Sequence, residues 1–413
     1  MHPTAAKTAK DSGRPAYRWV VLGAWIVSHV LAFSTMSVLG ILLPSITAEL
    51  GLSPAQQGLL GSSAQWGTMV LAIPFALWGS RYNPVLLTGA TLVLGAACVF
   101  LQGLAPGFAV LLVARVLFGL TITARRAGFA LLLQQWFAPR EIVLANSVVT
   151  GAFGAVMGLG WVGTPLLLDA VGGDWRDAMY VLGGLLVASA VVWAVLGRQR
   201  ITTEYATRVR SQAGSPLGSI FRYRDLWLCG LAFFGAQLAW MAFVTFWPTL
   251  MLDRYGASLK WSGSILGINS IAAAVAGLTV GLVATQPGRR RAVLIASGVV
   301  LALTLAAMNL TGSIPLLTSL DLVNGVAWGF WPLLMAIPFG LPGIKPREVA
   351  VALALLDTSM LAGGAVGPVL AGFVQQATGD IRVALIVASM FCLTLTATGL
   401  LVRVRRREVT TPA

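Results

Sequence analysis

The sequence predicts an all-α polytopic membrane protein with twelve transmembrane helices in two pseudo-symmetric six-helix bundles. Three observations lead to this fold class. The 413 residues are 57% hydrophobic and only 10% charged, with a mean hydropathy of +0.83, whereas soluble domains carry about 25% charged residues. Apolar runs of membrane-spanning length recur along the chain, and short motifs of the first half return in the second. This composition excludes a soluble enzyme, a disordered chain and a disulfide scaffold.

A helix needs about 20 apolar residues to cross a bilayer. Twelve segments satisfy this requirement, six on each side of a polar stretch in the middle of the chain. The first six predicted spans are 19–43, 58–78, 85–105, 109–133, 142–168 and 178–197. The second six are 226–251, 262–286, 292–311, 314–339, 349–374 and 382–402.

Lysines and arginines gather in alternate connecting segments, which predicts that both termini lie in the cytoplasm. On the opposite side we expect only Arg176, Arg254, Lys260 and Arg382. The net charge of +14 therefore indicates membrane topology and not nucleic acid. We expect a bacterial cytoplasmic (inner) membrane protein. Its predicted parts are a tail (1–17), a bundle (18–197), a cytoplasmic linker (198–225), a second bundle (226–402) and a tail (403–413).

The two halves share a set of local features, which predicts a duplicated six-helix unit. Each half has the tripeptide Pro-Arg-Glu before a glycine-rich span that ends near a proline, and each has two glycines seven positions apart. The matched elements are residues 139–141 and 346–348, Pro165 and Pro368, and the pairs Gly51/Gly58 and Gly256/Gly263. Repeats of this kind place a substrate near the midplane, between the halves.

Several residues match loop and helix motifs of a known transporter family. Gly281, Gly288, Arg289 and Arg290 match a Gly-x-x-x-Asp-Arg-x-Gly-Arg-Arg loop motif in the second half, and Arg81 marks its worn first copy. Arg115 and Gly119 match a helix 4 motif, Arg-x-x-x-Gly. With the twelve spans, these residues resemble the major facilitator superfamily, most closely its anion- and proton-coupled members. The resemblance implies alternating access and a central cavity lined by helices 1, 4, 7 and 10.

Titratable groups inside the spans are candidate functional residues, because each charge costs about 2.5–3.5 kcal/mol on insertion scales. They are Arg115, Arg125, Arg126, Asp321, Asp357 and His29. At about 100° per residue, Arg126 lies within about 20° of Arg115, so both are predicted to face the cavity and bind substrate. Arg125 points elsewhere, toward a neighbouring helix. The alternative is that all three arginines are paired inside the protein.

Helix 10 carries a polar and aromatic face that we expect to line the cavity. Its members are Asp321, Asn324, Trp328 and Trp331. Gln237 and Trp240 are candidates on helix 7, and Gln65 and Asn269 are weaker ones. All of these side chains could equally pack between helices.

Charges at matched depths suggest two ion pairs between the halves, an outer one of Arg115 with Asp321 and an inner one of Arg125 or Arg126 with Asp357. The arginines outnumber the aspartates by one. An unpaired buried cation is expensive, and an anionic substrate would supply its partner. The guanidinium fork of arginine suits a carboxylate.

The sequence therefore predicts a secondary active transporter for a small organic anion, a carboxylate, coupled to protons. We expect Asp357, Asp321, Arg125 and His29 to serve proton coupling or gating. Two alternatives stay open: proton-coupled efflux of a drug or metabolite, and transport of a small inorganic anion such as nitrate or cyanate. We expect no enzymatic activity, cofactor, metal site or nucleic-acid partner, and a chain that functions as a monomer in contact with membrane lipid.

Overall fold

A computed structural model describes residues 16–78, 83–137, 141–198, 222–283, 287–341 and 346–402. The described N-terminal half contains α1 (Tyr17–Ser37), α2 (Leu39–Leu50), α3 (Pro54–Trp78), α4 (Pro84–Gly103), α5 (Phe108–Trp136), α6 (Ile142–Ala170) and α7 (Trp175–Leu196). The C-terminal half contains α10 (Arg224–Tyr255), α11 (Leu259–Val283), α12 (Pro287–Met308), α13 (Ile314–Ala327), η2 (Trp328–Phe330), α14 (Trp331–Ala336), η3 (Ile337–Gly340), α15 (Pro346–Thr378), α16 (Ile381–Met390) and α17 (Leu393–Leu401). Most of the predicted tails and linker, residues 1–15, 199–221 and 403–413, lies outside the described ranges.

The helices agree with the predicted fold class. In the described part of the chain, ten helices are long and apolar enough to cross a membrane, and Leu39–Leu50 and Phe108–Thr123 are shorter apolar helices. Each helix overlaps one of the twelve predicted spans, and the described residues form no strand. The prediction of an all-α membrane protein with two six-helix bundles is therefore confirmed.

Three of the spans are not single α-helices. The first span breaks at Val38, between α1 and α2. The tenth passes through the 3₁₀ turn η2, and the twelfth breaks between α16 and α17. Pro332 and Pro338 stand at the starts of α14 and η3, where a missing N–H costs no helical hydrogen bond.

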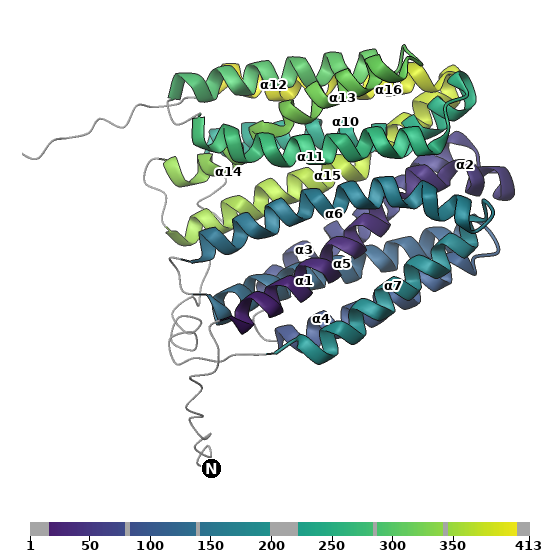
Figure 1. The fold of residues 1–413 in the computed structure, drawn as a ribbon. Helices are drawn as coiled ribbons and strands as arrows, with labels where there is room; N and C mark the ends of the chain where they lie inside the picture. Colours follow the sequence, from purple (N-terminus) through teal and green to yellow (C-terminus); the bar gives the residue numbers. More distant parts are fainter. Residues whose placement is uncertain are drawn as a thin grey trace, which may run out of the picture.

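The two bundles meet along two helix pairs, α3 with α15 and α6 with α11 (Figure 1). Gly58 lies against the carbonyl of Pro368, and Gly263 lies against Pro165. Small residues let membrane helices approach this closely. The matched glycines and prolines of the repeat thus make equivalent contacts across the interface, as a duplicated unit requires.

The bundles are packed together on one side of the molecule. We call the side where α1 begins and α17 ends the termini side, and the opposite side the far side (Figure 1). Toward the far side, Gly40 of α2 lies against the carbonyl of Val244 in α10. The ammonium of Lys260 in α11 pairs with Asp169 of α6. These contacts close the far side.

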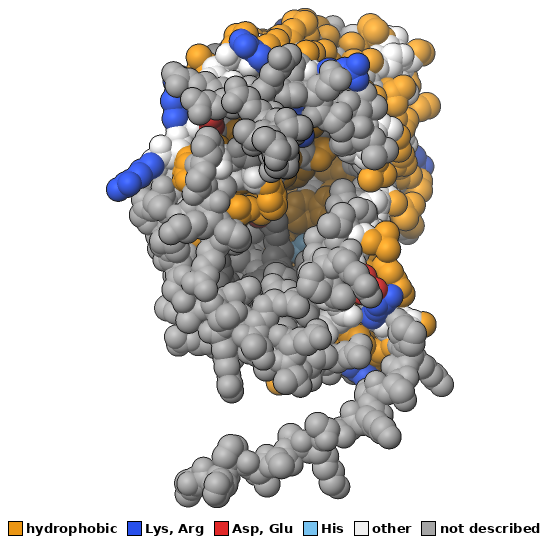
Figure 2. All heavy atoms as spheres, turned by 90° about the vertical axis from the view of Figure 1, so that its left-hand side faces the viewer, with side chains coloured by type: hydrophobic (Ala, Val, Ile, Leu, Met, Phe, Trp, Pro, Cys, Tyr) orange, Lys and Arg blue, Asp and Glu red, His pale blue; other side chains and the backbone are white. Residues whose placement is uncertain are grey.

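The termini side is hollowed near its centre (Figure 2). Hydrophobic side chains line the hollow, and a histidine is visible inside it. Among the described residues, His29 of α1 is the histidine. The structure is therefore closed on the far side and hollowed from the termini side, which is one of the two arrangements that alternating access requires.

Candidate substrate site between the two bundles

Arg115 belongs to the interior of the N-terminal bundle. Its guanidinium donates to the carbonyl oxygens of Met36 (3.1 Å) and Leu60 (3.3 Å) and to the amide oxygen of Gln102 (3.2 Å), and the residue is 1% exposed. Met36 lies in the last turn of α1, whose carbonyls have lost their helical partners because the helix breaks at Val38. A cation at a helix C-terminus also interacts favourably with the negative end of the helix dipole. Arg115 therefore stabilises the break and does not face the hollow, which corrects its predicted place in the substrate site.

Arg125 is also held within the N-terminal bundle. It donates to the carbonyl oxygens of Ser28 in α1 (3.3 Å) and Thr91 in α4 (3.2 Å), and it is fully buried. This agrees with the expectation that it turns toward neighbouring helices. Because its hydrogen bonds stay inside one bundle, it does not form the predicted inner ion pair with Asp357.

Arg126 follows Arg125 on α5, but its side chain lies outside the described residues. Its predicted contact with substrate therefore stays a prediction. Asp357 is half-buried on α15, a helix of the other bundle that packs against α3 and α10. Its predicted role in coupling stays open in the same way.

Asp321 and Asn324 face α11 and α12, which corrects the expectation that they line the cavity. The amide of Asn269 donates to Asp321 Oδ1 (3.0 Å) and Asn324 Oδ1 (3.1 Å), and Asn324 Nδ2 donates to the Thr304 hydroxyl (2.7 Å). Asp321 and Asn324 are both fully buried. The predicted outer ion pair is absent, because Asp321 accepts from Asn269 and Arg115 donates elsewhere.

Trp240 of α10 and Trp328 of η2 meet in a T-shaped contact, with ring centroids 5.7 Å apart. Trp331 makes a similar contact with Phe233 at 4.9 Å. Sequence reasoning missed Phe233, although it precedes Trp240 by seven residues, two helical turns, and so shares its face. We call the whole group the aromatic wall; its members are Phe233, Trp240, Phe243, Trp328, Phe330 and Trp331.

The half-buried positions of α10 show which way the aromatic wall faces. Most of the central part of α10 is buried, whereas Gln237 and Trp240, one turn apart, are half-buried, as is Trp331 of α14. We infer that these partly open side chains border the hollow, whose visible surface is hydrophobic (Figure 2). The structure thus brings together the predicted helix 7 and helix 10 residues Gln237, Trp240, Trp328 and Trp331.

Two glutamines, one from each bundle, lie near the same glycine beside this wall. Gln65 of α3 and Gln237 of α10 both approach Gly364 of α15, where an added β-carbon would lie 3.3 Å from Gln65 Nε2 and 3.4 Å from Gln237 Cγ. Gln65 is 2% exposed, and its Oε1 accepts no hydrogen bond within the described part of the protein. This arrangement leaves an acceptor for a ligand or water between the bundles.

His29 lies on α1, in the N-terminal bundle across from the aromatic wall. It is 6% exposed, and its ring stacks on Trp25 with centroids 4.5 Å apart. The stacking fixes the imidazole one helical turn after Trp25. A role for His29 in proton coupling stays a prediction.

The loop motif is only partly within the described residues. Arg81 lies outside them, and for Gly281 and Gly288 the structure describes the backbone at the end of α11 and the start of α12. Arg289 is exposed and Arg290 half-buried at the first turn of α12. The neighbouring Arg291, which sequence reasoning missed, donates to the carbonyl of Leu400 at the end of α17 (3.0 Å).

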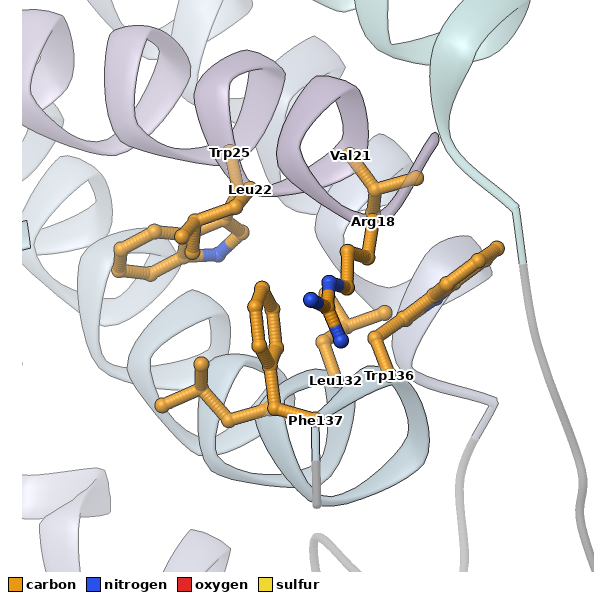
Figure 3. A pocket seen from close by; sticks show the side chains of 8 residues that line it. Arg18, Val21, Leu22, Trp25, Leu132, Trp136 and Phe137 are labelled. Carbon is orange, nitrogen blue, oxygen red and sulfur yellow. The ribbon is translucent and has the colours of Figure 1, made fainter. Parts of the chain in front are cut away.

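A small pocket between α1 and the end of α5 is a structural contact and not a substrate site (Figure 3). Its polar lining residue is Arg18, which pairs with Glu141 (2.9 Å) and lies over the ring of Phe137 (5.5 Å). The guanidinium is thus already occupied. The pocket is lined by Arg18, Val21, Leu22, Trp25, Leu132, Leu133, Trp136 and Phe137.

Comparison with known proteins agrees with this architecture. The chain is 24% identical to the probable sulfoacetate transporter SauU of Cupriavidus necator, over 88% of each chain. It is 26% identical to monocarboxylate transporter 11 of Mus musculus, over 94% of this chain and 88% of the relative. It is 25% identical to the gallate transporter of Pseudomonas putida, over 76% of this chain and 74% of the relative.

Solved structures show the same fold. A bacterial homologue of the human lysosomal transporter Spinster, in an inward-facing and occupied conformation, superposes with a TM-score of 0.73 at 17% identity, covering 94% of this chain and 95% of that one. The nucleoside transporter NupG superposes with a TM-score of 0.74 at 14% identity, covering 93% of this chain and 98% of that one. The Major Facilitator Superfamily profile matches residues 25–344 and 263–413. With its two six-helix bundles and the hollow between them, the chain belongs to the major facilitator superfamily and is a membrane transport protein, not an enzyme.

Proposed function

We propose that this protein transports a small organic anion, a carboxylate, together with protons. The observation that carries this proposal is that two buried arginines of the N-terminal bundle, Arg115 and Arg125, have only uncharged hydrogen-bond partners. Arg115, Arg125 and Arg126 lie on α5, whereas the acidic residues of the described N-terminal bundle lie at helix ends. The hydrogen bonds of Arg115 and Arg125 go to carbonyl and amide oxygens, which leave the formal charge in place. In a low-dielectric interior this charge favours an anion in the adjoining hollow.

The names of the relatives support the same substrate class. Those similar in sequence include transporters named for sulfoacetate, hexuronate, gallate and L-galactonate. All of these compounds are organic anions, and they differ widely in the part of the molecule that carries no charge. The shared anionic group fits a site whose fixed element is arginine.

Arg126 is the arginine of α5 that we assign to the substrate. Arg115 and Arg125 are engaged by the backbone of their own bundle, so their forks are not available for a second bidentate contact. Arg126 has the charge and fork geometry that a carboxylate requires. In this proposal the anion binds Arg126 at the hollow, which opens to the termini side in this conformation.

Asp357 is the group that we assign to proton coupling. As an anion on the C-terminal bundle, it competes with the substrate for an arginine. Protonation removes that competition, so that proton and anion bind together and move together. This mechanism needs no direct contact between the proton and the substrate, only an arginine that both carboxylates share.

The proposal also includes an orientation in the membrane and a motion of the two bundles. We place the termini side in the cytoplasm of a bacterial cell, because the basic segment Arg289–Arg291 and the termini lie on that side. The bundles 18–197 and 226–402 then rock against each other along α3–α15 and α6–α11, within one monomer. In this orientation the linker (198–225) and both tails are cytoplasmic.

The experiment is an uptake assay in proteoliposomes with an imposed pH gradient, run beside thermal melting of the detergent-purified protein. Benzoate, glucuronate, sulfoacetate, nitrate and the cationic dye ethidium serve as probes. We expect at least one organic anion to raise the melting temperature and to accumulate when the outside is acidic, because a ligand that binds only the folded state stabilises it. Stabilisation by nitrate alone, or by ethidium alone, would contradict the proposal.

A further inference from the structure

The geometry of the aromatic wall points to the body of the transported anion: we infer that it is a planar, aromatic carboxylate and neither a sugar acid nor a short aliphatic acid. The inference rests on the proposed function and adds to it the chemical nature of the uncharged part of the substrate, which arginine does not recognise. Its observations come from the C-terminal bundle, opposite α5. They concern ring geometry, the 3₁₀ turn and unused hydrogen-bond donors.

The 3₁₀ turn η2 explains how two tryptophans come to lie on the same side of the chain, with their rings in tilted contact. An α-helix rotates side chains by about 100° per residue, whereas a 3₁₀ turn rotates them by about 120°, so that residues three apart eclipse. Trp328 and Trp331 are three apart across η2, and their ring centroids are 6.4 Å apart. Gly329 between them allows close approach to α11, since an added β-carbon would lie 3.1 Å from the Ala276 carbonyl. The turn therefore presents two indoles in register toward α10.

Rings from α10 continue this surface. Trp240 meets Trp328 edge to face, Phe243 stacks on Trp240 at 6.2 Å, and Phe233 meets Trp331. Trp240 and Trp331 are half-buried, so each leaves part of a ring open at the border of the hollow. Aromatic groups prefer edge-to-face or offset partners at centroid separations of 4.5–7 Å. A planar ring that enters the hollow can make the same edge-to-face or offset contacts with the open parts of Trp240 and Trp331.

The indole N–H groups of this wall have no hydrogen-bond acceptor among the described residues. Trp328 is 9% exposed, and its Nε1 is buried without a hydrogen-bond partner in the described chain; Nε1 of Trp240 and Trp331 likewise donates to no described residue. Two other buried indoles do have a backbone acceptor. Trp193 donates to Val85 O (3.0 Å) and Trp247 to Met308 O (3.4 Å). Because buried tryptophans normally find an acceptor, the buried Nε1 of Trp328 indicates an oxygen atom supplied by a ligand or water, and the partly open indoles of Trp240 and Trp331 offer two further donors beside it.

The wall offers donors but few acceptors, and this separates the substrate classes. Each hydroxyl of a sugar acid is a donor that must find an acceptor when it leaves water, and the six rings of the wall supply none. A short aliphatic acid has no face to stack. An aromatic carboxylate places its ring against the wall and its carboxylate toward α5, and an oxygen carried by the ring can accept from the indole N–H groups.

The test is equilibrium binding to the full-length, detergent-purified protein by calorimetry, with benzoate, glucuronate and propionate as probes. We expect benzoate to bind about tenfold tighter than either competitor, the effect of roughly one or two good ring contacts. Trp328→Phe keeps the ring and removes the N–H, and we expect it to weaken binding of 4-methoxybenzoate, whose ring oxygen accepts but does not donate, about fivefold. Trp331→Leu removes a ring, and we expect it to weaken benzoate binding about tenfold.

Trp193→Phe is the matched control, because it also removes a buried indole N–H but lies on α7, away from the hollow. We expect it to lower the melting temperature and leave benzoate affinity unchanged. If glucuronate or propionate binds as tightly as benzoate, the inference fails while the proposed function stands. If Trp331→Leu leaves the ranking of the three probes unchanged, the aromatic wall does not select the substrate. If no organic anion binds at all, the proposed function itself fails.

Discussion

Gly58 of α3 lies against the backbone carbonyl of Pro368 in α15, so close that a β-carbon at residue 58 would collide with it. Gly263 of α11 is packed as closely against α6, where a β-carbon would collide with the backbone carbonyl of Trp161 and the ring of Pro165. Each contact joins the two bundles, and the two glycines are related by the internal repeat. They hold the bundles together toward the far side, so alternating access requires that both of them loosen.

We expect Gly58→Val and Gly263→Val to wedge the bundles apart at the far side and to slow transport without preventing insertion. The reporter is a disulfide between cysteines placed at Asp169 and Lys260, the residues of the far-side ion pair. Cross-linking should be efficient in the parent and clearly reduced when either valine is present. Gly163→Val is the control, since an added β-carbon at residue 163 has no neighbour within 4 Å among the described atoms. Equal cross-linking in all variants would show that the glycine contacts do not control closure.

Arg115→Gln is expected to destabilise the protein by about 1–3 kcal/mol, because three buried acceptors lose a charged donor. Arg115→Lys should cause an intermediate loss, since one ammonium cannot reproduce a planar fork that reaches three helices. Melting temperature of the purified protein is the measurement. A variant with unchanged melting temperature and lost substrate affinity would return Arg115 to the substrate site.

Arg125→Gln and Arg126→Gln should separate structure from binding at neighbouring positions. Arg125 ties α5 to α1 and α4, so its replacement should lower the melting temperature. Arg126→Gln should leave the melting temperature nearly unchanged and weaken binding of an organic anion by about tenfold or more, as expected for a lost charge-assisted contact. Normal affinity in Arg126→Gln would remove the main assignment of the proposed function.

The sequence was sufficient to predict the spans, because hydropathy and length decide which segments enter a bilayer. It was not sufficient to predict the break at Val38, since both sides of the break are equally apolar and the group that stabilises it, Arg115, comes from another helix. The placement of Arg115 failed for a related reason. A helical period gives the angle between two side chains, but it does not say which side of the helix faces the cavity.

The same limit explains the outcome on helix 10. Asp321, Asn324, Trp328 and Trp331 share a face of an ideal helix, yet the polar pair faces α11 and α12 while the tryptophans meet α10. The 3₁₀ turn that separates them lies in a run of Trp, Gly, Phe, Trp and Pro, and no local signal marks it as a change of helical period. Only the tertiary contact with Asn269 shows where the polar pair points.

Asp321→Asn is expected to keep both stability and uptake. Asparagine retains the oxygen that accepts from Asn269 and removes a charge that has no cation in contact, and burying such a charge costs several kcal/mol. Asp321→Leu, in contrast, should destabilise the protein because Asn269 loses an acceptor. Melting temperature and proton-driven uptake are measured together. Loss of pH-dependent accumulation in a well-folded Asp321→Asn protein would assign the transported proton to Asp321.

Asp357→Asn is expected to uncouple transport while substrate binding survives. Asparagine resembles the protonated carboxyl and cannot cycle, so the arginine that it faces in the proposed mechanism stays available to the anion. Binding by calorimetry should be retained, and exchange of substrate for substrate across proteoliposomes should continue, whereas accumulation driven by a pH gradient should fall. The competing explanation is that Asp357 only supports the packing of α15. In that case Asp357→Asn lowers the melting temperature, and exchange and accumulation fall by the same factor. A stable Asp357→Asn protein that still accumulates substrate with the pH gradient would show that the proton is carried elsewhere.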